Sequence, residues 1–382
     1  MFIEVCDDVL RKALNSSDED NEKAVETLRH LSWSIRRNYH LVHFPSIDEN
    51  DLENLRDILN SSEAKAICWS FSKRRDLQKM KSNLQFYASV SFDTDIATIG
   101  FEGAIIHINP KADSRLELFQ KSYLLTENLL DSEFYQYFAR AYQKSIHLDE
   151  CIYKINYYPL QGGGSSTGEV YIYECQQGQH FCLAILDSDK KWPNYKGYGQ
   201  TANTFEEHYK GYLVKNKEPI TCYYHVMENA CEIENLIPHS VLSVFSTNEQ
   251  KSFISSNPNA LPWLDIKKGF DYCMLFEDDA LKEWKQVFPL EIDWEKIEKI
   301  KSVCKDKDEF KDKIVAEKLP ELVKPWGKKI LEDVLRPKTK KQNKYDLKKV
   351  EISKLPLFQQ EEWGYIGRLI FSWCCCYVKT IY

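Results

Sequence analysis

The chain has 382 residues, of which 43% are hydrophobic and 29% are charged, and its formal net charge is −7. This length is sufficient for two domains, and the composition is that of a globular protein rather than a disordered one. The acidic balance excludes a protein that coats nucleic acid over its whole surface, so contact with nucleic acid requires a local basic patch.

The 12 cysteines are scattered through apolar segments, without a CxxC pair or zinc-ligand spacing. This pattern indicates free thiols in a cytoplasmic protein rather than a disulfide framework. The N-terminal residues MFIEVCDDVLRK lack the apolar core of a signal peptide. The apolar stretch 365–377 contains Arg368 and is too short to span a bilayer, so we expect no membrane partner. Two interpretations of the cysteine run 374–376 stay open: it is part of an apolar helix, or it has a palmitoylation or redox role.

Residues 1–118 are predicted to form an α/β unit whose role the sequence does not reveal. The pattern predicts helices over 22–37 and 49–59 and strands over 39–44, 86–91 and 104–108. The segment 64–72 is compatible with either type of structure. Four aspartates of this unit share no motif, and we interpret them as solvated surface: Asp7, Asp8, Asp93 and Asp95.

A central α/β unit is predicted over 119–240. Strand-like runs over 122–126, 152–157, 181–186 and 220–227 alternate with a helical pattern over 131–144, which predicts a mostly parallel sheet. From 241 to 382 the pattern becomes mainly helical, with Glu and Lys between apolar residues over 284–318. The sequence therefore predicts an α/β protein of three parts.

Acidic residues follow three of these expected strands. Glu127 follows the first, Asp187 and Asp189 follow the third, and Glu228 follows the fourth. The carboxyl ends of parallel strands share one edge of a sheet, and residues two apart on an extended segment point to the same side. Such carboxylates suit Mg²⁺ or Mn²⁺, and their crowding raises their pKa values until a cation is bound. Whether Glu228 or Glu234 completes the site stays open.

These residues resemble the TOPRIM family of topoisomerases, primases and nucleases. Glu127 in YLLTENLLD matches the family's first strand-end glutamate, and Asp187 and Asp189 in LAILDSDKK match its Asp-x-Asp pair. The glycine run 162–164 and the phrase VMENACEIENLIP resemble TOPRIM nucleases of prokaryotic phage-defence systems, the overcoming-lysogenization-defect-like nucleases. The resemblance covers residues 121–240 and implies a TOPRIM-type central domain.

The resemblance implies a metal-dependent endonuclease, a hydrolase of DNA or RNA. Its catalytic residues would be Glu127, Asp187, Asp189 and Lys190, and its Mg²⁺ or Mn²⁺ ligands would be Glu127, Asp187, Asp189 and Glu228. The resemblance to phage-defence nucleases implies that this chain is the effector subunit of such a system. Because the chain has no Walker motif, a controlling ATPase would be a separately encoded partner. The sequence is compatible with a homo-oligomer.

Basic residues dominate between 324 and 349, the best place for contact with nucleic acid. We predict phosphate contacts from Lys328, Lys329, Arg336, Lys338, Lys340 and Lys341. Trp326 and Tyr345 lie among them and are expected to stack on bases. Two other functions stay open: a Mn²⁺-dependent nucleotide-sugar transferase that uses the Asp-x-Asp pair, and a non-catalytic scaffold or sensor subunit.

Overall fold

A computed structural model describes residues 1–93, 100–102, 105–111, 116–216, 221–288, 291–319, 322–339 and 346–379. The chain divides into two compact units that alternate along the sequence. The first unit comprises Met1–Ile185, Glu207–His225 and Trp363–Tyr382, and the second comprises Leu186–Glu206 and Val226–Glu362. These divisions differ from the expected boundaries at 118 and 240, because later segments of the chain return to the first unit.

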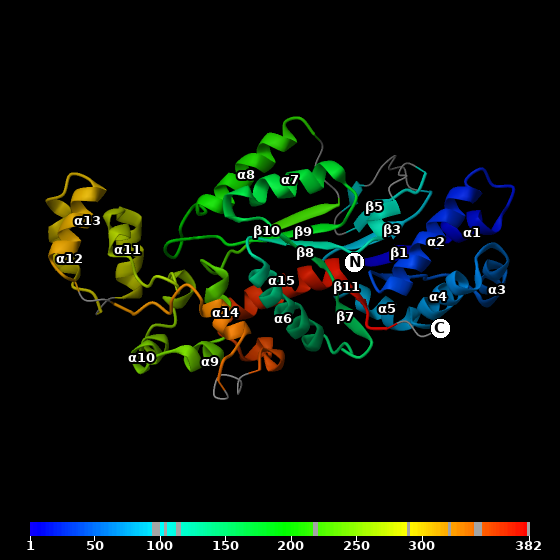
Figure 1. Ribbon diagram of the computed structural model, residues 1–382. Coiled ribbons are helices and arrows are strands. Elements are labelled where there is room, and N and C mark those ends of the chain that lie inside the picture. The colour runs from blue at the N-terminus through cyan, green and yellow to red at the C-terminus, as the bar shows by residue number, and fades with distance from the viewer. Residues whose placement is uncertain are drawn as a thin grey trace. The chain divides into compact units, whose positions relative to one another are not determined.

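A five-stranded sheet organises the N-terminal part of the first unit (Figure 1). Its strand order is β2 (Leu41–His43), β1 (Phe2–Val5), β3 (Tyr87–Val90), β5 (Ile105–Ile108) and β4 (Gly100–Glu102). Only β4 runs antiparallel to its neighbour. The helices of this part are α1 (Asp7–Leu14), α2 (Asn21–Arg37), α3 (Glu49–Ile58), α4 (Ser61–Ser72) and α5 (Arg74–Lys81). Most side chains of the parallel strands are buried, as expected for a sheet that helices cover.

The expected helices and strands of residues 1–118 are confirmed among the described residues. The ambiguous segment 64–72 is helical and belongs to α4. Its start is set by Asn60, whose Oδ1 accepts hydrogen bonds from the backbone N–H groups of Ser62 and Glu63, both at 3.0 Å. Glu63 in turn accepts from the Asn60 N–H at 3.0 Å, which completes a capping box.

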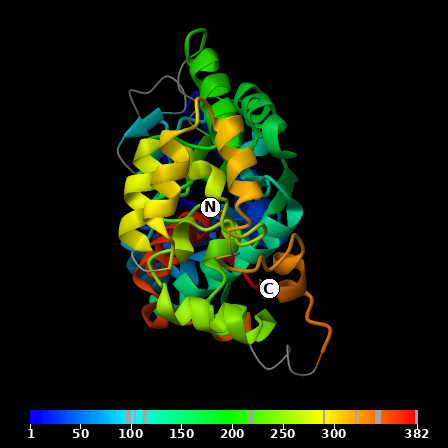
Figure 2. The same cartoon turned by 90° about the vertical axis from the view of Figure 1, so that its left-hand side faces the viewer.

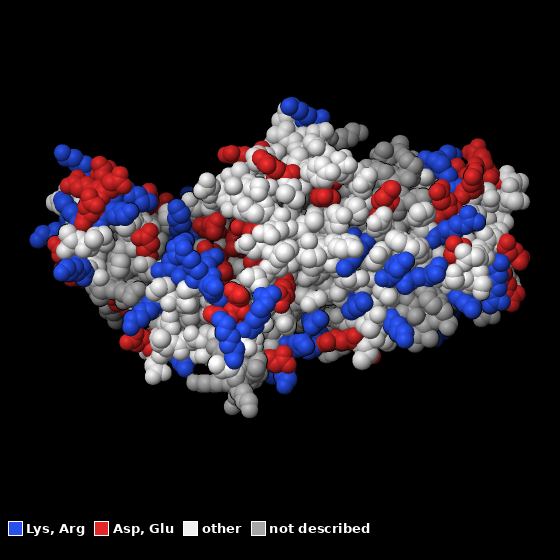
Figure 3. All heavy atoms as spheres, viewed as in Figure 1, with Lys and Arg blue, Asp and Glu red and all other residues white. Residues whose placement is uncertain are grey.

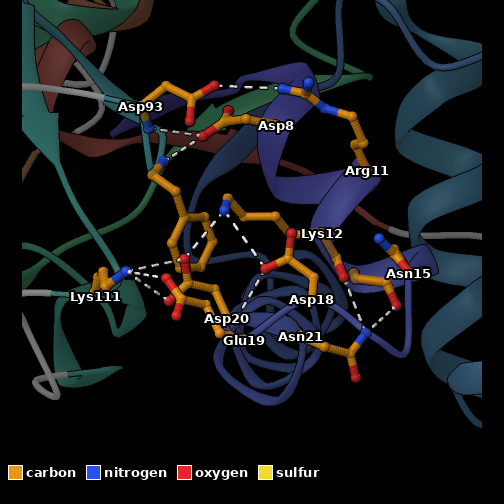
Figure 4. Close-up of polar contacts among 12 residues, drawn as sticks. Asp8, Arg11, Lys12, Asn15, Asp18, Glu19, Asp20, Asn21, Asp93 and Lys111 are labelled. Carbon is orange, nitrogen blue, oxygen red and sulfur yellow. Dashed lines mark hydrogen bonds and ion pairs between the residues drawn. The ribbon is translucent and has the colours of Figure 1, made fainter.

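The expectation that Asp8 is solvated is wrong. The residue is 4% exposed, and its Oδ2 accepts from the Ser91 hydroxyl at 3.0 Å and from the N–H groups of Phe92 and Asp93 (Figure 4). Asp93 is exposed and pairs with Arg11 at 3.3 Å, whereas Asp95 lies outside the described residues. The parallel order brings the ends of β1 and β3 together, so Asp8 closes the turn that follows β3.

A second, four-stranded sheet has the order β10 (Cys222–Val226), β9 (Cys182–Leu186), β6 (Tyr123–Thr126) and β8 (Tyr158–Gln161). Strand β6 pairs in parallel with both β8 and β9, which confirms a parallel sheet. The strand expected over 152–157 does not lie beside β6, because β7 (Tyr153–Ile155) pairs instead with β11 (Cys375–Tyr377). Pro159, which lacks an N–H, is tolerated in β8 because β8 is an edge strand.

Four further helices accompany these strands: α6 (Leu129–Ser145), α7 (Thr167–Gln177), α8 (Gln200–Leu213) and α15 (Leu357–Cys374). Helices α6 and α15 cross closely at Gly367, where an added Cβ would lie 2.6 Å from the Phe138 carbonyl oxygen. Trp363 stacks on the Phe138 ring at 4.0 Å. The cysteines 374–376 are fully buried where α15 ends and β11 begins. Within the described ranges, no helix is both long and apolar enough to cross a membrane.

The second unit is mainly helical, as expected for the C-terminal part. Its helices are α9 (His239–Leu242), α10 (Asn248–Ser256), α11 (Asp278–Val287), α12 (Trp294–Ser302), α13 (Lys307–Ala316) and α14 (Ile330–Leu335). The helical pattern over 284–318 is divided among α11, α12 and α13 because Asp293 and Asp306 cap new helices. These three helices, yellow to orange in Figure 2, enclose an aromatic core in which Trp284 stacks on Phe288 at 5.2 Å.

Candidate functional site

Glu127 follows β6 in the first unit, beside the expected glycine turn. The N–H of Gly162 donates to the Thr126 carbonyl at 2.8 Å, and the N–H of Gly163 donates to the Glu127 carbonyl at 3.0 Å. Gly163 has a φ of 75°, and a Cβ on Gly162 would lie 2.2 Å from Thr167 Oγ1. Both positions therefore require glycine, and the glycine run forms a fixed turn against the first residue of α7.

The turn that carries Asp187 and Asp189 follows β9, at the point where the chain enters the second unit. The Asp189 N–H donates to the Cys231 carbonyl at 2.8 Å, and the Ser188 hydroxyl donates to the Ala230 carbonyl at 2.6 Å. Asp189 has a φ of 48°, so the extended geometry expected for this pair is wrong. A Cβ on Gly199 would lie 2.0 Å from Asp189 Cβ, so glycine is needed beneath this carboxylate.

Asp187 belongs to a cluster of three carboxylates around one ammonium group. Lys267 Nζ lies 3.1 Å from Glu232 Oε2 and 3.3 Å from Glu234 Oε2. Between these two glutamates, the Ile233 N–H donates to Asp187 Oδ1 at 3.2 Å. Glu232 and Glu234 are 7% and 6% exposed. The amine of a protein side chain is therefore the cation of this cluster.

The pKa values of the cluster reflect burial first and the charges of its neighbours second. Burial raises the pKa of Glu232 to about 7; Lys267 opposes this shift, while Glu234 and Asp265 add to it. Burial also raises the pKa of Asp189. Burial by itself would lower the pKa of Lys267, but Glu234, Glu232 and Asp187 raise it well above its usual value. An additional cation would lower the free energy of the ionised carboxylates near neutral pH.

A tight turn from Asp265 to Gly269 presents the two lysines. The Lys268 N–H donates to Asp265 Oδ1 at 2.8 Å, and its Nζ lies 2.9 Å from Asp265 Oδ2. Gly269 has a φ of 82°, and a Cβ there would lie 2.9 Å from the Val323 carbonyl oxygen. The turn thus holds Lys267 against the buried glutamates and leaves Lys268 exposed.

A cavity of about 720 Å³ adjoins this cluster within the second unit. Its charged lining residues include the acids Asp189, Glu232 and Asp265 and the lysines Lys191, Lys268 and Lys307. Its less polar lining residues include Trp263, Phe270 and Met274. A cavity of this size, in which a few polar groups converge beside an apolar wall, is typical of a binding site for a small molecule or a single residue of a polymer.

The residues that the sequence grouped together fall in different units of the structure. Glu127 belongs to the first unit, and the other strand-end acids belong to the second. Glu228 is exposed, and it is Glu234 that shares Lys267 with Glu232. Lys190 Nζ donates to the Glu228 carbonyl at 3.0 Å, whereas its neighbour Lys191 lines the cavity.

No group of three His, Cys, Asp or Glu residues has the arrangement of a metal site within the part of the chain that the structure describes. Mg²⁺ commonly keeps several waters and binds through one or two carboxylates together with substrate phosphates. Asp189 and Glu232 both line the cavity and both have raised pKa values. These two carboxylates therefore face the same cavity.

The basic segment 324–349 is only partly described. Four of the predicted phosphate contacts are exposed: Lys328, Lys329, Arg336 and Lys338. Lys340, Lys341 and Tyr345 lie outside the described residues. Lys338 pairs with Asp333 at 2.8 Å, and Figure 3 shows acidic and basic side chains intermixed over the visible face. Trp326 Nε1 donates to the Ser246 hydroxyl at 2.7 Å, and its ring packs against the aromatic core, which disfavours stacking on a base.

The chain matches no model of a known protein family, no curated protein and no solved structure. No role was predicted from the sequence for Asp265, Lys267 or Lys268. The sequence DIKKG, a turn signal with two lysines, is the one local feature that draws attention to them. Their ion pairs depend on contacts between distant segments.

Proposed function

We propose that the chain is a divalent-cation-dependent nuclease whose reacting groups line the cavity of the second unit. The observation that carries the proposal is the meeting of exposed lysines with two carboxylates of raised pKa, the half-buried Asp189 and the buried Glu232, around one cavity. Carboxylates suit Mg²⁺ or Mn²⁺, and lysines suit the phosphate oxygens of a substrate. This combination is what hydrolysis of a phosphodiester requires.

Asp189 and Glu232 would hold the cation, which when bound would stabilise charge on the scissile phosphate and activate a water molecule. Lys268 and Lys191 would bind non-bridging phosphate oxygens. The capped turns that carry Asp189 and Lys268 keep these groups in fixed positions, so little order has to be gained when a substrate binds. Lys267 would keep Glu232 and Glu234 together before the cation arrives.

A TOPRIM-type arrangement of the second sheet is part of the proposal. The parallel pairing of β6 with β8 and β9, and the glycine turn after β8, support it. A role in prokaryotic phage defence, with a separately encoded ATPase as controlling partner, rests on the sequence resemblance. Co-purification from the native host is the direct test of that partner.

Cleavage assays on the full chain test the activity. Plasmid DNA and structured RNAs such as tRNA are incubated with Mg²⁺, with Mn²⁺ and with a chelator. We expect cleavage only with a divalent cation, and a loss of about 100-fold or more in Asp189→Asn and Glu232→Gln. Glu295→Gln, which changes an exposed residue of α12, serves as the matched control. Undiminished cleavage in both cavity variants would refute the proposal.

A further inference from the structure

We propose that the aromatic wall of the cavity receives one unstacked nucleobase, so that the substrate is single-stranded nucleic acid or a frayed end. The proposal rests on the nuclease function above and names its substrate class. Trp263 and Phe270 form the wall, and Lys268 and Lys307 lie along the same cavity. Stacking of bases on aromatic rings beside lysines is the common means of holding single strands.

The two aromatic residues are fixed by their own surroundings. Trp263 ends the short 3-10 helix Leu261–Trp263, and its N–H donates to the Ala260 carbonyl at 3.1 Å. Phe270 makes edge-to-face contacts with Trp284 at 5.0 Å and with Phe288 at 5.7 Å. Both rings are only partly buried and both line the cavity. Because both rings are already held in place, they would lose little conformational entropy when a base binds.

The charges of the cavity favour a nucleotide unit that carries a cation. The lining lysines are Lys191, Lys268 and Lys307, and the lining carboxylates are Asp189, Glu232, Asp265 and Asp271. With all seven groups ionised, this is three positive charges against four negative ones. A bare anion is disfavoured in such a cavity, whereas a phosphate paired with a divalent cation is accepted beside the neutral base.

The size of the cavity favours one nucleotide over a double helix. Its volume of about 720 Å³ lies in the range of small-molecule sites. A base in an intact duplex would have to leave its stack to enter, at a cost of a few kcal/mol that a single strand does not incur. The cavity therefore selects unpaired nucleotides.

Binding in Ca²⁺ tests the inference separately from cleavage. A short fluorescently labelled single strand and a hairpin duplex are titrated with the full chain, and Ca²⁺ affinity is measured by calorimetry. We expect the single strand to bind about 10-fold more tightly than the duplex, because a paired base of the duplex is not free to stack on the aromatic wall. Trp263→Leu should remove most of this preference, and Trp263→Phe should retain it. Tyr173→Leu, which changes an exposed aromatic residue of the first unit, is the control.

The outcomes separate this inference from the nuclease proposal. If Trp263→Leu keeps its thermal transition, its Ca²⁺ affinity and the full preference for single strands, or if the wild type prefers the duplex, the inference is overturned. Metal-dependent cleavage in those cases would still support the nuclease. Conversely, Trp263-dependent binding of single strands without any cleavage would support the base site and refute the nuclease.

Discussion

Two acidic clusters, one in each unit, use their carboxylates in opposite ways. In the first unit, Asp20 is 6% exposed, and although burial would raise its pKa, hydrogen bonds from Lys12 and Lys111 lower it (Figure 4). In the second unit, Glu232 is 7% exposed and its pKa rises to about 7 in spite of Lys267. Similar exposure therefore goes with opposite pKa shifts: the lysines outweigh burial at Asp20, whereas burial outweighs Lys267 at Glu232.

Removal of Lys267 should give the largest effect. Lys267→Met leaves Glu232 and Glu234 buried without their shared ammonium, and we expect a loss of about 3 kcal/mol of unfolding free energy at pH 8. Thermal or urea unfolding measures it. Addition of Mn²⁺ should restore more stability in this variant than in the wild type. Equal stability of the variant and the wild type without metal would show that the cluster is not under electrostatic strain.

Asp8 is another buried carboxylate of the first unit, held by neutral hydrogen-bond donors instead of lysines. Asp8→Asn replaces a carboxylate oxygen that accepts hydrogen bonds from Ser91, Phe92 and Asp93, so the unfolding free energy should fall by about 2 kcal/mol. Urea unfolding of the variant beside wild type gives the value. A neutral or stabilising substitution would mean that Asp8, like Glu232, is a strained carboxylate.

Substitution of Glu232 should raise the unfolding free energy instead of lowering it, and the size of this effect should depend on pH. Its raised pKa means that the folded state holds this proton more tightly than the unfolded chain, whose glutamates titrate near 4.3. Its contribution to stability is therefore present below about pH 4.3 and is lost as the pH rises to about 7. Glu232→Gln should be roughly 2–3 kcal/mol more stable than the wild type at pH 8 and similar to it near pH 4.5. Glu295→Gln should keep the wild-type pH profile.

The smallest effect is expected for the pair Arg11 and Asp93. Both side chains are largely exposed, at 72% and 62%, so Arg11→Met should change the unfolding free energy by less than about 0.5 kcal/mol. Urea unfolding of the wild type and the variant at low and at high salt measures this change in unfolding free energy. A larger loss would mean that exposed pairs hold the first cluster together, which would weaken the contrast drawn between the two units.

Much of the fold could be predicted from local patterns. The runs before Glu127 and Asp187 are short, apolar and bounded by polar residues, and both are strands. The pairing of β7 with β11 could not be foreseen, because it joins residues more than two hundred positions apart. The contacts of Lys267 with Glu232 and Glu234 could not be foreseen either, because tertiary packing sets them. From the sequence alone, a lysine in a turn is expected to be solvated. Local patterns thus drew attention to Asp189, which lines the cavity, but not to Lys267.

The alternation of the two units along the chain has a practical consequence for dissection. A fragment that ends at residue 240 retains Asp189 and Glu232 but loses Asp265, Lys267 and the aromatic core formed by α11–α13. Neither half of such a division contains a whole cavity. Deletion experiments would therefore report misfolding where point substitutions report chemistry. A tag or fluorescent label is better inserted at an exposed position, such as Val214, than used to replace a terminal third of the protein.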